Sequence, residues 1–389
     1  MRDVLVPRTL LRDPAGFGGA PDGDCLRGDL VVTGARVTGM TASEATKRPR
    51  MVIPALAEAH CHLDKCHTIA RLGAVGGDLR QAIARQWDDK ANWTEDDLRT
   101  RAGRGLRGAE AAGCSALRTH VDWGTVPEPP LAWSVMADMD SPLELQRAAL
   151  LGIDQWADPD FAAAVGPHLH GGVPGAFILG HDKTREGLRA IFGYAIAQGA
   201  PLDFHVDEGL GDLDGVEAVA DMALEMRFDG PILCGHAVGL MDKAPADFAR
   251  IAEKCARAGI TICALPTTNL YLQGRSDGTP DRRGLTRLRE LRAAGVPVIV
   301  ASDNVGDAFC PTGQHDPMAA LHLAHLAAHL DPPMSDWLGM ITTDARKALG
   351  LEPIYVDGAP QSALRQSSAA SVADLVAGRA PLTPLMMEH

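Results

Sequence analysis

The segment Gln198-Gly199-Ala200-Pro201-Leu202-Asp203-Phe204-His205-Val206-Asp207-Glu208 contains the pattern that decides the fold. A helix-like stretch ends at a glycine, which readily takes the left-handed conformation found at helix C-termini. A short apolar run follows, as expected for a buried parallel strand, and it ends in side chains that can do chemistry. The same order of features recurs along the chain and predicts repeated units of helix and strand.

Eight apolar runs fit this pattern, at residues 52–56, 116–117, 145–151, 177–179, 202–204, 232–233, 260–262 and 298–300. Together they occupy residues 51–350, a length that suits an α/β fold of the TIM type, a (β/α)8 barrel. The alternative is a doubly wound open sheet, which gathers its chemistry at one switch point. Because reactive side chains follow runs all along the chain, the barrel is favoured.

The two ends of the chain lack the repeated pattern. Residues 30–32 and 373–376 are short candidate strands near glycines. We therefore expect residues 1–50 and 351–389 to form a small β-rich appendage, separate from a barrel over 51–350.

Composition excludes several classes of protein. Lys and Arg number 37 against 50 Asp and Glu, so the formal charge of −13 argues against nucleic-acid or anionic-membrane binding. No apolar run approaches the ~18 residues of a spanning helix, and the start lacks a signal-peptide core, so we expect a cytoplasmic protein. The 8 cysteines are too sparse for a disulfide scaffold and are expected to be free thiols. The sequence leaves open whether the chain forms a homo-oligomer.

His60 and His62 stand at the end of the first run. Positions i and i+2 of a strand share a face, so the two imidazoles point the same way. His205, His236 and Asp303 end other predicted strands, and the carboxyl ends of barrel strands meet at one mouth. Imidazole and carboxylate groups are good ligands for zinc or iron, so the sequence predicts a metal site there.

Glu208 follows His205 by three residues, just past a predicted strand end. A carboxylate in that place would overhang the metal and move protons between water and substrate. The alternative is an exposed loop acid, which the neighbouring histidine disfavours. Asp207 is expected to face elsewhere.

Other polar residues near strand ends have weaker patterns. Cys66 and His67 lie beyond the strand end and are interpreted as structural. Three more residues could line the pocket or support the ligands: His120, Asp122 and His181. A third group follows the eighth run and is interpreted as polar positions on a helix: His315, His322, His325 and His329.

These residues together resemble the amidohydrolase superfamily, in the branch of bacterial cytosine deaminases and triazine aminohydrolases. The resemblance covers about residues 51–350. It rests on six motifs, which are His60-Cys61-His62-Leu63-Asp64-Lys65, Arg118-Thr119-His120-Val121-Asp122, His205-Val206-Asp207-Glu208, Gly235-His236-Ala237, Leu272-Gln273-Gly274-Arg275 and Ser302-Asp303-Asn304-Val305.

The resemblance implies one divalent ion, Zn²⁺ or Fe²⁺, in the active site. Its ligands would be His60, His62, His205 and Asp303. Asp303 would also accept a proton from water, His236 would stabilise the reacting centre and Glu208 would shuttle protons. Lys183 lies beyond the fourth run, where it cannot form the bridging carbamate of two-metal relatives, so a single ion per chain is expected.

The implied reaction is hydrolytic deamination of a small amino-substituted heterocycle, with release of ammonia. Cytosine, isocytosine and related pyrimidines or aminotriazines are the expected substrates, and isocytosine ranks at least equal to cytosine. The enzymatic alternative is removal of an N-alkyl amine from a triazine, or hydrolysis of a cyclic amide. A catalytically inactive barrel used for binding is a third hypothesis, which the complete ligand set disfavours.

Substrate-binding residues are the weakest part of the pattern. The glutamine that cytosine deaminases carry after the third strand has no counterpart in the same frame, and Asp154 or Gln155 would replace it. Asn304 stands where cytosine deaminase has a second acid. Phe309 and Trp123 are expected to enclose one small planar ring.

Overall fold

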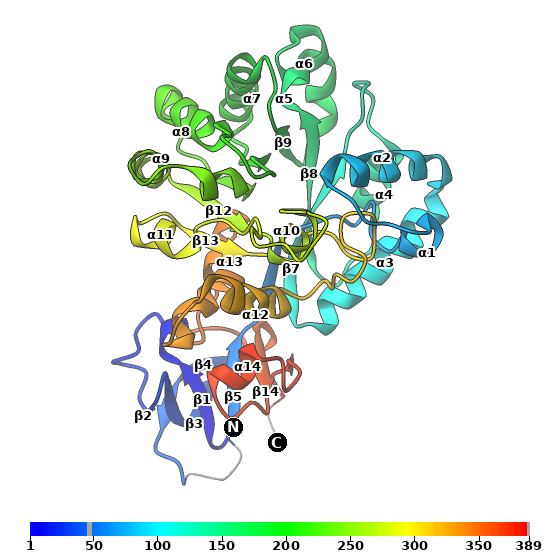
Figure 1. Cartoon of the computed structure of the whole chain (residues 1–389). Coiled ribbons are helices and arrows are strands. Elements are labelled where there is room, and N and C mark those ends of the chain that lie inside the picture. Colours follow the sequence, from blue (N-terminus) through cyan, green and yellow to red (C-terminus); the bar gives the residue numbers. More distant parts are fainter. Residues whose placement is uncertain (45–48, 387–389) are drawn as a thin grey trace.

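The computed structural model describes residues 1–44 and 49–386, which form a barrel beside a small sheet (Figure 1). The barrel contains eight strands arranged in chain order, and neighbouring strands run parallel. This order confirms the (β/α)8 prediction over the doubly wound sheet. The strands are β6 (Leu56–Cys61), β7 (Cys114–Asp122), β8 (Glu144–Gly152), β9 (Val173–Ile178), β10 (Leu202–Val206), β11 (Ile232–His236), β12 (Ile260–Ala264) and β13 (Val298–Val300).

The barrel closes at a seam between β6 and the residues after β13. One isolated bridge joins Cys61 to Asp303 there, and Asp303 N donates to His60 O at 2.9 Å. The buried Glu58 side chain also links the two edges of the seam, because its Oε1 accepts a hydrogen bond from Ser302 N at 3.2 Å. The seam therefore has fewer backbone contacts than the ladders between the other strands.

Helices surround the barrel (Figure 1). The α-helices are α1 (Ile69–Leu72), α2 (Leu79–Asp89), α3 (Glu95–Ala111), α4 (Leu131–Ala137), α5 (Ile153–Trp156), α6 (Pro159–Val165), α7 (Thr184–Gln198), α8 (Gly215–Met226), α9 (Pro245–Arg257), α10 (Pro266–Leu272), α11 (Leu288–Ala293), α12 (Pro317–Ala328) and α13 (Thr343–Ala348). Short 3₁₀ helices are η2 (Lys90–Asn92), η3 (Gly166–Leu169), η4 (Val238–Asp242) and η5 (Met334–Ile341).

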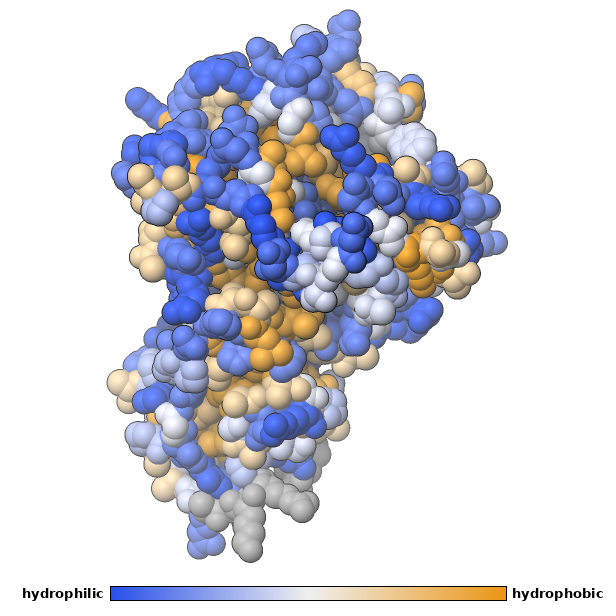
Figure 2. All heavy atoms as spheres, in the orientation of Figure 1, coloured by the Kyte–Doolittle hydropathy of each residue, from blue (hydrophilic) through white to orange (hydrophobic). Residues whose placement is uncertain are grey.

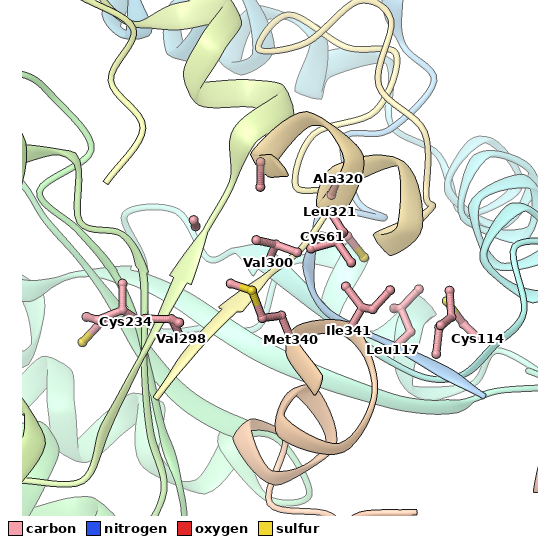
Figure 3. Packing of buried hydrophobic residues seen from close by; sticks show 14 of the residues in the cluster. Cys61, Cys114, Leu117, Cys234, Val298, Val300, Ala320, Leu321, Met340 and Ile341 are labelled. Atoms are coloured by element: carbon pink, nitrogen blue, oxygen red, sulfur yellow. The ribbon is translucent and has the colours of Figure 1, made fainter. Parts of the chain in front are cut away.

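Apolar side chains fill the layer between the strands and these helices. Figure 3 shows Cys61 and Val300 packed between Leu321 of α12 and Met340 of η5. Cys61 thus faces away from the barrel interior, as strand alternation predicts for a residue between two inward histidines.

The small sheet is built from both chain ends, as predicted. Its elements are β1 (Val4–Pro7), η1 (Arg8–Leu10), β2 (Ala20–Asp22), β3 (Cys25–Thr33), β4 (Arg36–Thr41), β5 (Arg50–Pro54), η6 (Gln361–Ala363), β14 (Leu364–Ser367), α14 (Val372–Val376) and β15 (Thr383–Pro384). Both termini lie in this part of the molecule (Figure 1).

Two sequence interpretations here were wrong. The run at 52–56 is not one barrel strand, because β5 belongs to the small sheet and β6 begins only at Leu56. Residues 373–376 lie in helix α14, which the Ser371 side chain caps by accepting from Asp374 N. Local apolar patterning could not tell this short helix from a strand.

Two further properties accord with the composition. Among the described residues, no helix is long and apolar enough to cross a bilayer. The 8 cysteines are all buried and none forms a disulfide. The division into parts 1–50 with 351–389 and 51–350 stays a prediction about independently folding units.

Candidate metal centre and active site

Four predicted ligands meet at the barrel mouth: His60 of β6, His62 just after it, His205 of β10 and Asp303 after β13. His205 Nε2 lies 3.1 Å from the Nε2 atoms of both His60 and His62. Asp303 Oδ1 lies 3.3 Å from His62 Nε2 and 3.6 Å from His60 Nε2. All four side chains are buried. The structure thus brings together residues that are far apart in the sequence.

These spacings suit the ligands of one ion. Atoms held at about 2.0–2.2 Å from a tetrahedral ion lie about 3.3 Å from one another. Burial and neighbouring imidazoles lower the pKa of His60 and His205 well below the usual value, so both rings are neutral, the form that binds metal. The pKa of Asp303 is lowered, because the contacts with His62, His236 and Thr268 together outweigh the effect of burial and favour the ionised carboxylate. The donor set fits zinc or ferrous iron.

His120 is an alternative ligand, because its ring lies near the three ligand histidines, with a centroid 4.0 Å from that of His60. Its Nε2 lies 2.9 Å from Asp203 Oδ1, and the other oxygen of Asp203 accepts from Arg118 Nη1 at 2.8 Å. This contact engages His120 with a buried carboxylate behind the ligand set. His120 does not line the substrate cavity and contacts Asp203, so a role in supporting the ligands stays a prediction.

His236 ends β11 beside the ligands. Its Nδ1 lies 3.2 Å from Asn269 Nδ2, and an amide NH₂ can only donate, so Nδ1 accepts. Burial lowers the pKa of His236 to about 4, so the neutral ring carries its one proton on Nε2. That nitrogen lies 3.6 Å from Glu208 Oε2. Asn269 therefore aims an N–H group of His236 at the reacting region.

Glu208 is buried beside His236, and Asp207 turns away from it. Burial, with the charge of Asp303, raises the pKa of Glu208 well above its ordinary value, which favours the protonated carboxyl. Gln273 Nε2 holds the Glu208 backbone by donating to its carbonyl at 3.1 Å. Asp207 instead accepts from the first two backbone N–H groups of α8, at 3.0 and 2.9 Å.

Two site residues have strained backbones. His236 has φ 70 and Asp303 has φ 62, in the left-handed region that non-glycine residues avoid. Each such conformation costs about 1–3 kcal/mol and persists only where surrounding structure holds it. This strain after β11 and after β13 is typical of an active site.

A cavity of about 250 Å³ opens onto this cluster. Figure 2 shows apolar residues in the hollow at the middle of the barrel, surrounded by hydrophilic residues. The cavity is lined by His62, Lys65, Leu79, Ile83, Gln86, Trp87, Lys90, Asp122, Trp123, Gly124, Thr125, Leu150, Leu151, Gly152, Gln155, Phe177, His205, Glu208, His236, Asn304 and Phe309. A larger groove along residues 281–290 shares none of these residues, so the reactive groups belong to the smaller cavity.

Most of the predicted substrate-binding residues lie in this cavity wall, namely Trp123, Gln155, Asn304 and Phe309. Asp154 does not line it, because its Oδ1 accepts from Lys183 N at 3.0 Å. The Gln155 amide is already engaged with the backbone, accepting from Gly152 N at 2.7 Å and donating to Gly124 O at 2.8 Å. His181 is also outside the cavity wall, where its Nδ1 accepts from Leu179 N at 3.0 Å.

Two wall residues had not been assigned a role from the sequence. Lys65 Nζ pairs with Asp122 Oδ1 at 2.9 Å and lies 4.8 Å from the centroid of the Phe309 ring. Gln86 of α2 is buried; its Oε1 accepts from Thr68 Oγ1 at 3.4 Å, and its Nε2 has no hydrogen-bond partner among the described residues. No strand-end pattern marks Gln86, because it comes from a helix between the first two barrel strands.

Comparison with known proteins identifies the family. The family model described as "Amidohydrolase family" matches residues 160–355. A curated relative, pterin deaminase of Rhizobium rhizogenes, is 34% identical over 352 residues, which span 86% of this chain and 80% of the relative. The chain belongs to the amidohydrolase family. It is accordingly a hydrolytic enzyme that acts on C–N bonds, as the sequence resemblance implied.

Two other similar proteins differ in their named substrates. N-isopropylammelide isopropyl amidohydrolase of Pseudomonas sp. (strain ADP) is 22% identical over 343 residues, covering 82% of this chain and 80% of the relative. The solved 5-methylcytosine deaminase of Klebsiella pneumoniae, liganded with 5-fluorocytosine, has a TM-score of 0.79 at 24% identity, covering 95% of this chain and 97% of that one. This second similarity supports the fold.

Proposed function

We propose that this amidohydrolase is a metal-dependent deaminase that releases ammonia from a small amino-substituted nitrogen heterocycle. The observation that carries the proposal is the grouping at the cavity floor. Three imidazoles and the Asp303 carboxylate lie at ligand spacing, next to the buried Glu208 carboxyl group and Nε2 of His236. The resident ion is proposed to be Zn²⁺ or Fe²⁺.

An ion held there supplies Lewis acidity, which can bring the pKa of water to about 7. Asp303 accepts a proton from the attacking water. Glu208 gives its carboxyl proton to a ring nitrogen, which makes the neighbouring carbon more electrophilic. His236 donates its Nε2–H to the oxygen where negative charge develops. The proton taken by Asp303 then passes to the amino group, the C–N bond breaks and ammonia leaves. As the carbonyl forms, the hydroxyl proton of the reacting centre returns to Glu208.

For the substrate we propose the 2-amino-4-oxopyrimidine edge that isocytosine and pterin share. Asn304 Nδ2 donates to Asp307 Oδ2 at 2.7 Å, so Asn304 Oδ1 is left as an acceptor for a ring N–H. The unpartnered Nε2 of Gln86 offers a donor to a ring carbonyl. A 34% identical relative is named pterin deaminase, which favours the fused ring. Cytosine, whose amino and carbonyl groups are exchanged, ranks below both.

Ammonia release from a substrate panel tests this proposal. The panel should contain pterin, isocytosine, cytosine, 5-methylcytosine, an aminotriazine and N-isopropylammelide, assayed with zinc or ferrous iron. The highest kcat/KM is expected for pterin or isocytosine. Release of isopropylamine without ammonia from any ring would favour the N-alkyl reaction of the 22% identical relative. If neither ammonia nor isopropylamine is released from any compound, both the deaminase and the N-alkyl reaction are contradicted.

Gln86→Met tests the proposed carbonyl contact. The substitution keeps the length of the side chain but removes the donor, and one lost hydrogen bond costs about 0.5–1.5 kcal/mol. KM should therefore rise by up to about tenfold, with a smaller change in kcat. Gln81→Met is the matched control, since Gln81 is exposed on the same helix and does not line the cavity. Equal kinetics for the two variants would contradict the contact.

A further inference from the structure

A second group of ligand-type side chains lies outside the active site. Cys66 and His67 follow β6 and the two histidines there, whereas His315 belongs to the loop that leads into α12. The Cys66 Sγ and one ring nitrogen from each histidine all lie within 4.8 Å of one another. The His67 and His315 rings meet edge to face, with centroids 5.8 Å apart. None of the three residues lines the substrate cavity.

Three ring nitrogens of this group lack hydrogen-bond partners among the described residues. His315 is 4% exposed, and neither of its ring nitrogens has a hydrogen-bond partner among the described residues; nor does His67 Nε2. Burial lowers the pKa of His315 to about 3 and that of His67 to about 4, so both rings are neutral with a free lone pair. Buried polar atoms normally have partners, so three such nitrogens at one place need an explanation.

Helix α3 makes room for the His315 ring. At Gly105, in the interior of this helix, an added Cβ would lie 2.8 Å from His315 Nε2 and 2.6 Å from a methyl carbon of Leu63. A glycine inside a helix costs about 1 kcal/mol relative to alanine. Gly105 thus lowers the stability of the helix slightly, but it leaves space for the His315 imidazole, which a larger side chain would displace.

We propose that Cys66, His67 and His315 bind a Zn²⁺ ion separate from the ion of the active site. A thiolate and two neutral imidazoles are a ligand set that zinc favours, with water able to fill the fourth position. Zinc ligands lie roughly 3.5 Å from one another, so the three side chains need to close by about 1 Å. The site takes its ligands from two loops that the sequence separates widely.

The proposed ion would brace the barrel seam. The loop with Cys66 and His67 directly follows the ligand His62, and the loop with His315 continues from Asp303. A backbone hydrogen bond already joins these loops, in which His67 N donates to Val305 O at 2.9 Å. A zinc ion between these loops would stabilise the seam of the barrel, where few backbone hydrogen bonds join the two edges. It would thereby also stabilise the spacing of the proposed catalytic ligands. Its role is therefore structural.

Binding exchanges a proton for the ion. The Cys66 thiol now donates weakly to Leu63 O at 3.3 Å and Arg101 O at 3.5 Å. When zinc binds, the S–H bond breaks, the sulfur electron pair forms the Zn–S bond and the proton goes to solvent. No oxidant or reductant takes part.

Cobalt substitution of the whole enzyme tests this site. Co²⁺ bound to a thiolate gives an intense charge-transfer band in the near ultraviolet, whereas the proposed catalytic ligands include no sulfur. We expect this band at saturating Co²⁺, and about two ions per chain after loading with Zn²⁺. Cys66→Ser should abolish the band and lower the zinc content to about one ion. Cys255→Ser, which changes a buried thiol on α9, should retain both.

His315→Asn is the second variant, because it leaves the thiol in place but removes an imidazole ligand. It should shift or weaken the band and lower the zinc content in the same way. Absence of a thiolate band at full cobalt loading, or a band unchanged in Cys66→Ser, would overturn the site. These measurements use no substrate, so their failure leaves the proposed deaminase activity untouched.

Discussion

Asp303→Ala is expected to lose turnover and the active-site ion together. The variant removes a carboxylate whose Oδ1 lies 3.3 Å from His62 Nε2, and with it the proposed proton acceptor. Loss of proton transfer alone lowers a rate by about 10²–10⁴-fold, and loss of a ligand adds to this. Steady-state kinetics and elemental analysis of the purified variant measure the two effects.

Two further variants sharpen this test. Asp303→Asn keeps an oxygen ligand but lacks the charge, so it should retain more metal than Asp303→Ala while staying nearly inactive. Asp3→Ala removes another buried aspartate, which lies just before β1 and far from the ligands in the sequence, and should retain both metal and turnover. Full metal content and normal kcat in Asp303→Ala would remove this residue from the site.

Glu208→Gln is expected to keep the metal and lose roughly 10²-fold or more in kcat. The amide preserves the size of the side chain, but it cannot give up and regain a proton as the carboxyl does. Glu208 lies 3.6 Å from His236 Nε2 and is not among the four proposed ligands, so elemental analysis should match the unmodified enzyme.

The control for this second change is Glu225→Gln on the surface. That carboxylate pairs with Arg185 and Arg189, away from the cavity, and its loss should leave kcat unchanged. A metal-replete Glu208→Gln enzyme with normal turnover would show that another group moves the protons.

The amidohydrolase barrel could be predicted from the sequence because its signals are local. Each buried parallel strand needs a continuous apolar run, and each helix end needs a residue that tolerates the left-handed conformation, as Gly199 does after α7. The two histidines around Cys61 share a face for the same reason, since side chains alternate along any strand. These constraints act within a few residues, so their patterns can be recognised in the sequence alone.

Short apolar runs show the limit of such signals. The run at 52–56 and the segment 373–376 were both expected to be single strands, but β5 pairs with the small sheet and α14 is helical. In each case the deciding factor is what the segment packs against. An apolar pattern of a few residues fits either outcome, so only tertiary packing selects one.

What the sequence by itself determined is the fold class, the strand-end positions of the proposed catalytic side chains and the family to which the chain belongs. Only the tertiary structure showed that the His120 ring contacts Asp203, that Gln86 of α2 lies in the cavity wall and that His315 meets Cys66. The physical reason is range: alternation and capping act between neighbours in the chain, whereas these contacts depend on barrel closure, which brings distant loops to one rim.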